Sequence, residues 1–411
     1  MRKLEVGCMD PLEILTNKES LFPFFQPIFS ADDHQIIGYE ILGRMKVDQD
    51  FHSIGPFFED ESVPDEYRIE IDDYITKKAL KEVYQIENIS IFINRNPNLL
   101  MVDRGESLLN LLLLFKERGL DLSRIVLEIT EHNYKGDIEQ LGHVLTYFRT
   151  YGIKLAIDNV GKEGSNLDRL RMLNPDILKV DLSLLRQTTT AQSYLDILYS
   201  LSLLARKIGS ALLYEDIEML FQLQYAWRNG GRYYQGFYLA KPSEKIIDKD
   251  FRKELLKMEI HSFISHEKRK LSAQYDICSE FTNRMTQLNT KLKTKDYDQI
   301  LNQVAQVFSK ESFRIYICDG EGFQQSANIY KTSEDEWVLQ AEYVNKNWSW
   351  RPYFLENIAR MNYDKRGILS DLYSDIESGE MIRTFSFPLS EQLYIFIDLS
   401  YDFLFEQEYL L

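Results

Sequence analysis

Three short apolar runs in the middle of the chain each end on a charged residue. The first ends in Glu128, the second in Asp158, and the third carries Lys179 and ends in Asp181. Core packing does not call for charges at these points, whereas α/β proteins place metal ligands and general bases at the carboxyl ends of buried strands. The pattern therefore predicts that these side chains meet at one polar site.

The segments around those runs predict the scaffold that holds the site. From about Phe24 to Ala240, apolar runs of strand length alternate with segments of helical period, as in repeated βα units with a mainly parallel sheet. Strands are expected at 24–29, 36–41, 91–93, 125–128, 155–158, 177–180, 211–215 and 234–239, and helices at 66–84, 107–118, 138–150, 166–173, 193–208 and 217–228. This pattern fits a (β/α)8 TIM-like barrel. An open doubly wound sheet is the alternative, but no G-x-G-x-x-G motif follows the first strand.

A barrel would bring further polar residues to the same face, because the carboxyl ends of its strands meet at one mouth. The residues on the predicted strand ends are Glu40, Asn94, Glu128, Asp158, Lys179, Asp181 and Glu215, and Gln235 starts or lines the eighth strand. Several carboxylates in one mouth repel one another unless positive charge shares the space. Oxygen ligands without a histidine or cysteine cluster suit Mg2+, Mn2+ or Ca2+. None of the six histidines lies at a predicted strand end, so zinc is not expected.

The pattern changes after Lys241-Pro242. Residues 246–291 carry no glycine or proline and predict a long helix, which either packs with one solvated face or acts as a spacer or dimer-forming helix. A second helix is expected at 297–308. Strands at 313–318, 323–330, 342–348, 384–388 and 393–399, with a helix at 352–361, predict a small antiparallel α+β domain. Three tryptophans fall in it, for which packing is favoured over a ligand cavity. Residues 48–64 read as an excursion from the barrel.

Composition limits the classes of function. A net charge of −16 over 411 residues argues against binding of nucleic acid polymers. Cys8, Cys278 and Cys318 are odd in number and far apart, which suits a reducing cytoplasm. The N-terminus has no apolar signal region, and the most apolar run, 108–115, is too short to span a membrane.

The strand-end residues lie in motifs that resemble those of the EAL-domain family. Gln26-Pro27-Ile28 resembles QPI, and Glu40-Ile41-Leu42-Gly43-Arg44 resembles E-x-L-x-R. The others follow in order: Asn94-Arg95-Asn96-Pro97 (N-x-S-P), Glu128-Ile129-Thr130-Glu131 (E-x-T-E), Asp158-Asn159-Val160-Gly161 (D-D-F-G), Lys179-Val180-Asp181 (K-I-D), Glu215-Asp216-Ile217-Glu218 (E-G-V-E) and Gln235-Gly236-Phe237 (Q-G-Y), with Lys241-Pro242 at the close. The resemblance covers roughly residues 20 to 243.

This resemblance implies binding of cyclic di-GMP and its metal-dependent hydrolysis to linear pGpG, since paired divalent ions activate water and neutralise phosphate charge. The implied metal ligands are Glu40, Asn94, Glu128, Asp158 and Asn159, for Mg2+ or Mn2+, with Ca2+ as a non-productive ion. Lys179 would orient the attacking water and Glu215 would be the general base. The implied ligand-binding residues are Gln26, Leu42, Arg44, Asp181, Glu218, Gln235 and Pro242.

The layout implied for the whole chain is an EAL barrel at 1–243, a helical linker at 244–310 and a PAS-like sensory or dimerisation domain at 311–411, acting as a homodimer in the cytoplasm. The sequence departs from the family at Asn159, where the motif has a second aspartate, and in the loop 160–166. Asparagine keeps an oxygen ligand but loses the charge. Two classes of function stay open, a cyclic di-GMP phosphodiesterase of reduced activity and a cyclic di-GMP receptor with little turnover. A glycosidase using Glu128 and Glu215 is disfavoured, because Lys179 and Arg44 suit phosphate better.

Overall fold

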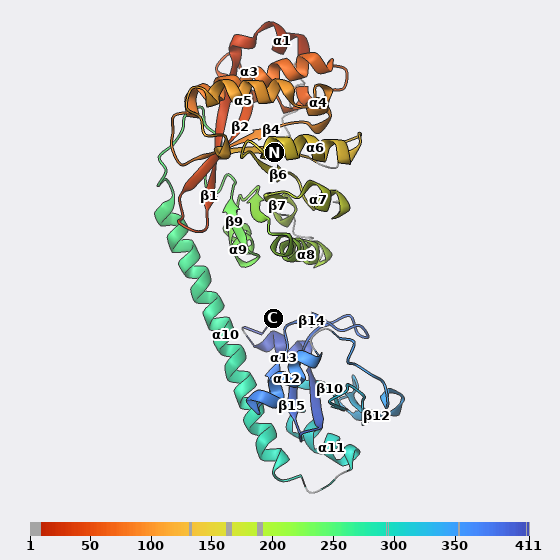
Figure 1. The fold of residues 1–411 in the computed structure, drawn as a ribbon. Helices are drawn as coiled ribbons and strands as arrows, with labels where there is room; N and C mark the ends of the chain where they lie inside the picture. Colours follow the sequence, from red (N-terminus) through yellow and green to blue (C-terminus); the bar gives the residue numbers. More distant parts are fainter. Residues whose placement is uncertain are drawn as a thin grey trace. The chain divides into compact units, whose positions relative to one another are not determined.

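The computed structural model describes residues 10–130, 134–161, 167–186, 192–292, 294, 296–351, 354–407 and 409–410. The chain forms two compact units, Met1–His261 and Ser262–Leu411, which are drawn with their elements in Figure 1. The predicted division into three parts, with boundaries at 243 and 310, stays a prediction. Within the described residues, no helix combines the length and the apolar character needed to cross a membrane.

The first unit is a closed barrel, which confirms the predicted fold class. Its sheet runs in the order β1-β9-β8-β7-β6-β5-β4-β2-β3, and an additional pairing of β1 with β2 closes it. From β2 through β4 to β9, each strand of the barrel is parallel to the next, whereas β1 is antiparallel to both β2 and β9. The strands are β1 (Leu21–Ser30), β2 (Ile36–Val47), β3 (Asp50–Ser53), β4 (Ser90–Asn94), β5 (Ile125–Ile129), β6 (Lys154–Ile157), β7 (Ile177–Asp181), β8 (Ala211–Glu215) and β9 (Gly231–Tyr234).

Helices lie outside the strands of the barrel (Figure 1). They are α1 (Pro11–Thr16), α2 (Gly55–Glu59), α3 (Asp65–Val83), α4 (Pro97–Val102), α5 (Glu106–Lys116), α6 (Ile138–Arg149), α7 (Leu167–Leu173), α8 (Gln192–Ile208) and α9 (Leu220–Arg228). Helix α6 shows why such segments form. The Asp137 side chain caps it by accepting from the backbone N–H of Glu139, and Leu141, Leu145 and Phe148 are buried at helical spacing.

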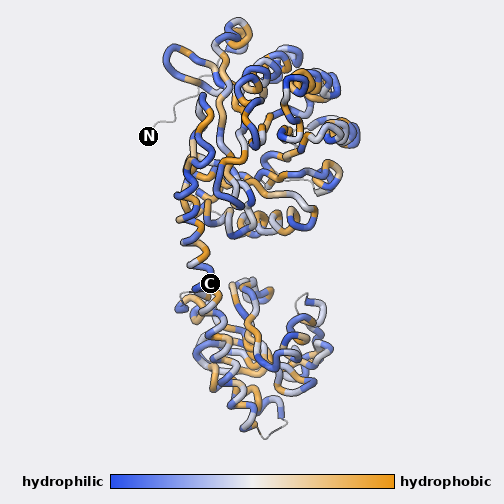
Figure 2. Tube along the Cα trace, turned by 60° about the vertical axis from the view of Figure 1, so that its left-hand side comes forward, coloured by the Kyte–Doolittle hydropathy of each residue, from blue (hydrophilic) through white to orange (hydrophobic). Residues whose placement is uncertain are grey.

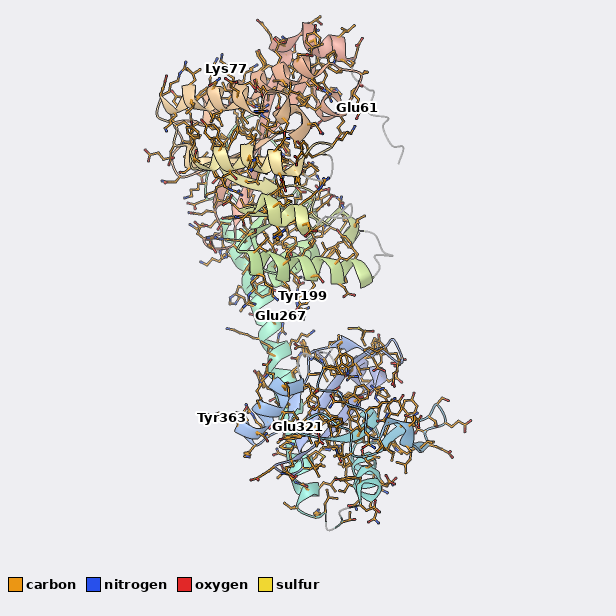
Figure 3. The ribbon with its side chains drawn as sticks, turned by 45° about the vertical axis from the view of Figure 1, so that its right-hand side comes forward. Glu61, Lys77, Tyr199, Glu267, Glu321 and Tyr363 are labelled. Atoms are coloured by element: carbon orange, nitrogen blue, oxygen red, sulfur yellow. The ribbon has the colours of Figure 1, made fainter. Side chains whose placement is uncertain are left out.

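Apolar side chains fill the interior of the barrel and hold its strands together. One buried cluster takes a residue from each of six strands: Ile28, Phe92, Val126, Ala156, Ile177 and Leu213. Full burial of a large apolar side chain contributes about 1.5–3 kcal/mol. Figure 2 shows the hydrophobic residues gathered along such inner segments. Exposed polar side chains lie on the outside of the barrel, as Lys77 of α3 does in Figure 3.

Three predicted segments of this unit differ in the structure. Strand β2 continues to Val47 and pairs with β3, so the excursion at 48–64 contains a hairpin strand and helix α2. Strand β9 ends at Tyr234, so the strand predicted at 234–239 is wrong beyond its first residue. The long helix α10 (Lys253–Asn289) begins seven residues later than predicted, because Ser243 pairs with Phe25 and the carbonyl of Lys249 accepts from Ile36.

The second unit is an α+β domain, as predicted, built on an antiparallel sheet. The sheet order is β12-β11-β10-β16-β15-β13, and β14 pairs with β15. Its elements are α11 (Tyr297–Val307), β10 (Ser312–Asp319), β11 (Asn328–Lys331), β12 (Trp337–Gln340), α12 (Phe354–Asp364), β13 (Ile368–Leu369), β14 (Tyr373–Ser374), β15 (Met381–Pro388), β16 (Leu393–Leu399) and α13 (Tyr401–Glu406). The strand predicted at 342–348 is wrong, since Ala341–Tyr343 is a 3-10 helix.

The two faces of this sheet are covered by different helices. Along β10, Ile315 and Ile317 pack into a cluster with Phe281 of α10, whereas Tyr316 and Cys318 pack with residues of α12 on the opposite face. This alternation is the period of two that a strand imposes on its side chains. Both faces are therefore covered, and the central strands β10, β15 and β16 are buried along nearly their whole length.

Candidate functional site

Lys179 of β7 is the centre of the polar site in the barrel. Its side chain is 1% exposed, and its Nζ lies 3.0 Å from Glu128, 3.2 Å from Glu40, 3.3 Å from Glu215 and 3.4 Å from Asp158. The four carboxylates come from β5, β2, the end of β8 and the residue after β6. The convergence predicted from the sequence is confirmed for these five residues, which we call the Lys179 cluster.

The register of the barrel explains why the side chains meet. Asn94 lies beside Glu128 on adjacent parallel strands, and Asp181 lies beside Glu215. The side-chain amide of Asn94 donates to Glu40 at 2.7 Å, and that of Gln235 donates to the other oxygen of Glu40 at 2.7 Å. Glu40 itself lies in the middle of β2 and not at its end, so that strand-end prediction is corrected. Gln235 was predicted to start or line the last strand and lies just past the end of β9.

Burial and charge shift the pKa values of the cluster in different directions. Burial, the proximity of Glu40 and that of Asp158 raise the pKa of Glu128 well above its usual value, although Lys179 acts to lower it. Burial and Asp158 likewise raise the pKa of Glu215. Burial also acts to raise the pKa of Glu40, but Lys179 and the two amide donors lower it overall. Lys179 thus compensates the charge of Glu40 better than it compensates that of Glu128 or Glu215.

Some hydrogen-bond acceptors in and beside the Lys179 cluster have no donor. Oε1 of Glu128, Oδ1 of Asp158 and Oε1 of Gln235 are buried without a hydrogen-bond partner. Four carboxylates around one lysine also leave an excess of negative charge, which a divalent cation would neutralise. Among the described residues no three acidic, histidine or cysteine side chains stand ready-arranged to hold a metal, because the carboxylates here converge on Lys179. The donor set fits a hard cation that would displace part of these ion pairs.

The turn after β6 is held in place around Asp158. The backbone N–H of Asp158 donates to Ile129, and that of Val160 donates to Lys179. Asn159 adopts a left-handed conformation with φ of 57°, which asparagine tolerates better than most residues. Its amide donates to Asp158 at 2.8 Å. Asn159 therefore positions Asp158. Residues 162–166 of the predicted loop, and Glu131 of the E-x-T-E motif, lie outside the described residues.

The remaining predicted site residues surround the cluster without joining it. Gln26 lies opposite Glu40 in the β1–β2 pairing, and Leu42 lies opposite Phe24. Asp181 is buried, and its side chain accepts from the N–H of Ser183 at 2.5 Å. The rest lie further out: Arg44 contacts Ser53, Glu218 is exposed and paired with Arg186, and Pro242 precedes the residue that pairs with Phe25.

A cavity of about 280 Å3 beside the cluster includes residues that the sequence patterns did not single out. Leu42, Arg44, Asn94 and Glu128 line it, together with Arg95 and others from α2 and α3. Arg95 is buried and pairs with Asp72 and with Asp73, the latter at 2.8 Å. It thereby ties α3 to the end of β4. A basic residue next to Asn94 at the end of an apolar strand was the available signal.

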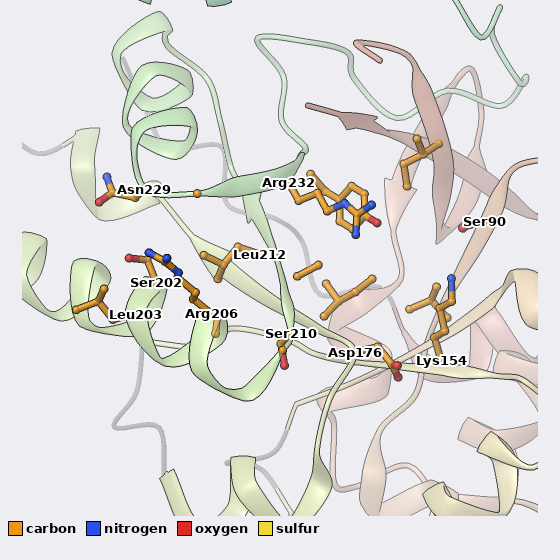
Figure 4. Close-up of a pocket in the computed structure, with 18 of the residues that line it drawn as sticks. Ser90, Lys154, Asp176, Ser202, Leu203, Arg206, Ser210, Leu212, Asn229 and Arg232 are labelled. Atoms are coloured by element: carbon orange, nitrogen blue, oxygen red, sulfur yellow. The ribbon is translucent and has the colours of Figure 1, made fainter. Parts of the chain in front are cut away.

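A wider cavity, of about 730 Å3, opens at the opposite end of the barrel. Lys154, Asp176 and Ser210, which line it, lie at the start of β6 or just before β7 and β8 (Figure 4). The Lys179 cluster is at the carboxyl ends of the same strands. The functional site is assigned to the carboxyl end of the barrel, because Lys179 and its four carboxylates converge there, and not to the wider cavity on grounds of its size.

Comparison with known proteins agrees with this geometry. The family model for the EAL domain matches residues 12–242, which is more than half of the chain. The chain belongs to the EAL-domain family. A second model, for the EAL-domain associated signalling protein domain, matches residues 246–411.

Relatives of this EAL-domain chain include one of the same layout. It is 53% identical over 404 residues to the uncharacterized EAL-domain containing protein YkuI of Bacillus subtilis, with 97% of this chain and 99% of the relative covered. The crystal structure of that protein in complex with substrate c-di-GMP and calcium superposes with a TM-score of 0.92, covering 98% and 100% of the two chains. The probable cyclic di-GMP phosphodiesterase PdeG of Escherichia coli is 26% identical over 56% of this chain and 47% of its own length.

Proposed function

We propose that this EAL-domain protein binds cyclic di-GMP at the carboxyl end of the barrel, together with a divalent cation, and hydrolyses one phosphodiester bond to give linear pGpG. The observation that carries the proposal is the Lys179 cluster, in which Lys179 contacts four carboxylates and buried oxygens of Glu128 and Asp158 remain without hydrogen-bond partners. Support comes from the 53% identical YkuI protein, whose crystal structure contains c-di-GMP and calcium.

The roles of the residues follow from their chemistry. Glu40, Asn94, Glu128 and Asp158 would hold the cation, with Asn159 as a weaker neutral oxygen ligand. A bound divalent ion would lower the pKa of a ligated water and neutralise charge on the phosphate. Arg44, at the edge of the neighbouring cavity, would contact a phosphate, because its planar guanidinium matches two phosphate oxygens. Gln26, Leu42, Asp181, Glu218, Gln235 and Pro242 would shape the ligand site.

The hydrolytic step needs a base and a cation beside the attacking water. Glu215 would accept a proton from water as the water oxygen forms a bond to phosphorus, and the bond from phosphorus to the ribose oxygen breaks. The leaving oxygen takes a proton, so one water is consumed for each pGpG formed. Burial and the charge of Asp158 raise the pKa of Glu215, which makes it a stronger base than an ordinary carboxylate. Lys179 would orient the water and balance the carboxylates.

A second candidate is a receptor that binds cyclic di-GMP with little turnover. The specific observation in its favour is Asn159, whose amide donates to Asp158 and brings no negative charge. Mg2+ and Mn2+ are the ions proposed for turnover, and Ca2+ is proposed to support binding without efficient turnover, because it tolerates looser geometry.

One experiment distinguishes the two candidates. Calorimetry with cyclic di-GMP in the presence of Mg2+, Mn2+ or Ca2+ tests binding, and chromatography of pGpG from the same samples tests hydrolysis. Binding with cation-dependent pGpG formation supports the enzyme, and saturable binding without pGpG supports the receptor. No saturable heat with any of the three ions would reject both.

We also propose a homodimer in the cytoplasm. Support for the dimer comes from Ile264, Leu271 and Tyr275 of α10, apolar side chains that are 38%, 51% and 68% exposed at spacings of seven and four residues. Support for the compartment comes from the sparse cysteines. Light scattering of the full chain should give twice the monomer mass, and Leu271→Lys should lower it while Tyr363→Lys, at a separate exposed aromatic residue, should not. A monomeric wild type contradicts the dimer.

A further inference from the structure

Gln222 of α9 is a fully buried amide that bonds to the chain segments after β7 and after β8. Its Nε2 donates to the carbonyl of Leu182 at 2.7 Å and to that of Asp216 at 3.2 Å. Its Oε1 accepts from the backbone N–H of Glu218 at 2.8 Å and from that of Met219 at 3.0 Å. A side-chain amide has two donors and an oxygen with two lone pairs, so the Gln222 side chain uses its full hydrogen-bonding capacity here.

The two segments that Gln222 joins carry residues of the Lys179 cluster. Leu182 comes directly after β7, which holds Lys179, and Asp216 follows Glu215 at the end of β8. The backbone N–H of Leu182 donates to the carbonyl of Glu215 at 3.1 Å. Because Gln222 donates to the carbonyls of Leu182 and Asp216, it continues the pairing of β7 with β8 beyond Glu215. The chain on both sides of the Glu215 carboxylate is thereby fixed to the neighbouring strand.

The turn that follows Glu215 needs such support, because its backbone is unusual. Asp216 has a φ of 56°, in the left-handed region that residues other than glycine seldom adopt. The next residue, Ile217, is fully buried; its N–H donates to the carbonyl of Gln235 at 3.1 Å, and its carbonyl accepts from the N–H of Tyr238 at 2.9 Å. The turn is therefore held on one side by Gln222 and on the other by the chain after β9.

We propose that Gln222 is a positioning residue for Glu215. The inference rests on the proposed hydrolysis, in which Glu215 accepts a proton from the attacking water. Oε2 of Glu215 lies 3.3 Å from Nζ of Lys179, and this distance spans the two strands whose ends Gln222 joins. The four hydrogen bonds of Gln222 are to backbone atoms, so it acts through the placement of Glu215 and not on the substrate.

The same side chain also caps α9, and a cap alone would be a structural role. Oε1 of Gln222 accepts from the N–H of Met219, the residue before the helix, as glutamate or glutamine does at this position of a capping box. The two roles use different atoms, because Oε1 serves the cap and Nε2 serves the strand ends. Gln222→Glu separates them, since a carboxylate still accepts from Glu218 and Met219 but does not donate to Leu182 and Asp216. Gln222→Met removes both roles.

The first test measures pGpG formation by the full chain in Mg2+ or Mn2+. Both variants should lower kcat at least about tenfold, while KM, and the Kd of cyclic di-GMP measured in Ca2+, change less than about threefold. Circular dichroism shows that each variant is folded, and Gln222→Glu, which keeps the cap, decides the test if Gln222→Met does not fold.

Gln324→Glu is the matched control for this test. Gln324 of the second unit is also fully buried, and its Nε2 donates to Ser326 at 2.9 Å and to Asn328 at 2.8 Å. The substitution therefore removes two donated bonds from an equally buried amide that lies in the other unit. We expect it to leave kcat unchanged.

Hydrogen exchange measures the positioning itself and needs no turnover. The amide of Leu182, whose acceptor is the carbonyl of Glu215, should exchange at least about tenfold faster in the two Gln222 variants than in the wild type. The amide of Asp158, which donates to Ile129 elsewhere in the barrel, should exchange at an unchanged rate.

The outcomes separate this inference from the proposed hydrolysis. The role of Gln222 is overturned if exchange at Leu182 is unchanged in both variants. It is also overturned if the wild type forms pGpG and the variants keep its kcat, or if kcat falls only in step with the affinity for cyclic di-GMP. A wild type that binds cyclic di-GMP without forming pGpG contradicts the hydrolysis, and the exchange at Leu182 then decides alone whether Gln222 holds Glu215 in place.

Discussion

Asn159 and Asp158 differ only by an amide in place of a carboxylate, and that difference bears on the cation site. The amide of Asn159 donates to Asp158 at 2.8 Å and so holds it without adding charge. A carboxylate at position 159 could not donate this bond and would repel Asp158, unless a cation lay between the two. Asn159 therefore fixes the position of Asp158 through a hydrogen bond but supplies no negative charge to attract a second ion.

Asn159→Asp should raise the rate of pGpG formation in Mg2+ or Mn2+ at least about tenfold, equivalent to about 1.4 kcal/mol of transition-state stabilisation. The added charge would strengthen cation binding beside Asp158. Single-turnover chromatography of pGpG measures the effect. Asn159→Gly is the matched control, since glycine accepts the φ of 57° without offering an oxygen. An aspartate variant no faster than the wild type would rule out this cause of slow turnover.

Lys179 is the second residue whose replacement is informative. Lys179→Met should lower the free energy of unfolding by about 3–5 kcal/mol when a chelator is present, because two buried and two partly buried carboxylates lose their counter-charge. Urea unfolding measures the loss. Added Mg2+ should reduce it, since a divalent cation replaces the missing charge. Lys77→Met, at an exposed position on α3, should change little. An equal loss with and without Mg2+ would argue against a cation site in the cluster.

At the scale of elements, the strands of the barrel do most of the positioning, and this is the part that the sequence predicts best. A strand that is buried on both faces is an apolar run in the sequence, so a charged residue in it is easily noticed. The carboxyl ends of parallel strands in a barrel lie close together at one mouth. The convergence of Glu128, Asp158, Lys179 and Glu215 was therefore predictable. Elements that depend on distant partners were not. The predicted helix began at Ile246, yet the hydrogen bonds that Ser243 and Lys249 make to Phe25 and Ile36 keep this segment out of the helix, and α10 begins at Lys253.

The same reasoning explains the misses around the site and in the second unit. Glu40 was placed at a strand end because β2 was expected to stop at Ile41, whereas pairing with β3 carries it to Val47. The segment 342–348 carries Tyr343, Val344 and Trp348, but within the described residues its backbone bonds to the turn residues 322–324 and to no strand of the sheet. Trp337–Gln340 pairs with β11 instead. Local pattern does not decide which of two adjacent segments takes the edge of a sheet.

The contact between α3 and β4 gives a prediction at this scale. Arg95, which follows β4, pairs with Asp72 and Asp73 of α3, and burial already raises the pKa of both carboxylates. Arg95→Met should lower the free energy of unfolding by about 3–5 kcal/mol, because it leaves two partly buried acids without their counter-charge. Chemical denaturation measures this. Arg206→Met, at an exposed arginine of α8, is the control. A loss as small as in the control would show that α3 and β4 do not depend on this pair.

At the scale of the whole molecule, the two units differ in how their buried charges are paired. Lowering the pH should therefore affect the stability of the two units differently. The barrel concentrates carboxylates around one lysine, while the second unit surrounds Arg314 with Asp375, Asp398 and Glu377. Burial acts to raise the pKa of Asp375, but the hydrogen bonds and charge of Arg314 and the N–H of Ser378 lower it overall. In the second unit the network therefore stabilises the ionised form of Asp375.

The lowered pKa of Asp375 sets the direction in which the stability of the second unit changes with pH. Because the pKa of Asp375 is lower in the folded state than in the unfolded one, its stabilisation is fully present above the unfolded pKa, near 3.9, and is lost as the pH falls through the folded pKa. Asp375→Asn should therefore destabilise the second unit at neutral pH and flatten its loss of stability below about pH 4. Urea unfolding followed by tryptophan fluorescence reports mainly on this unit, since Trp337, Trp348 and Trp350 lie in it. Asp335→Asn, at an exposed aspartate of the same unit, is the control. If the asparagine variant at 375 keeps the full acid sensitivity of the wild type, then Asp375 does not supply the linkage, and Glu377 or Asp398 becomes the group that holds Arg314 in place.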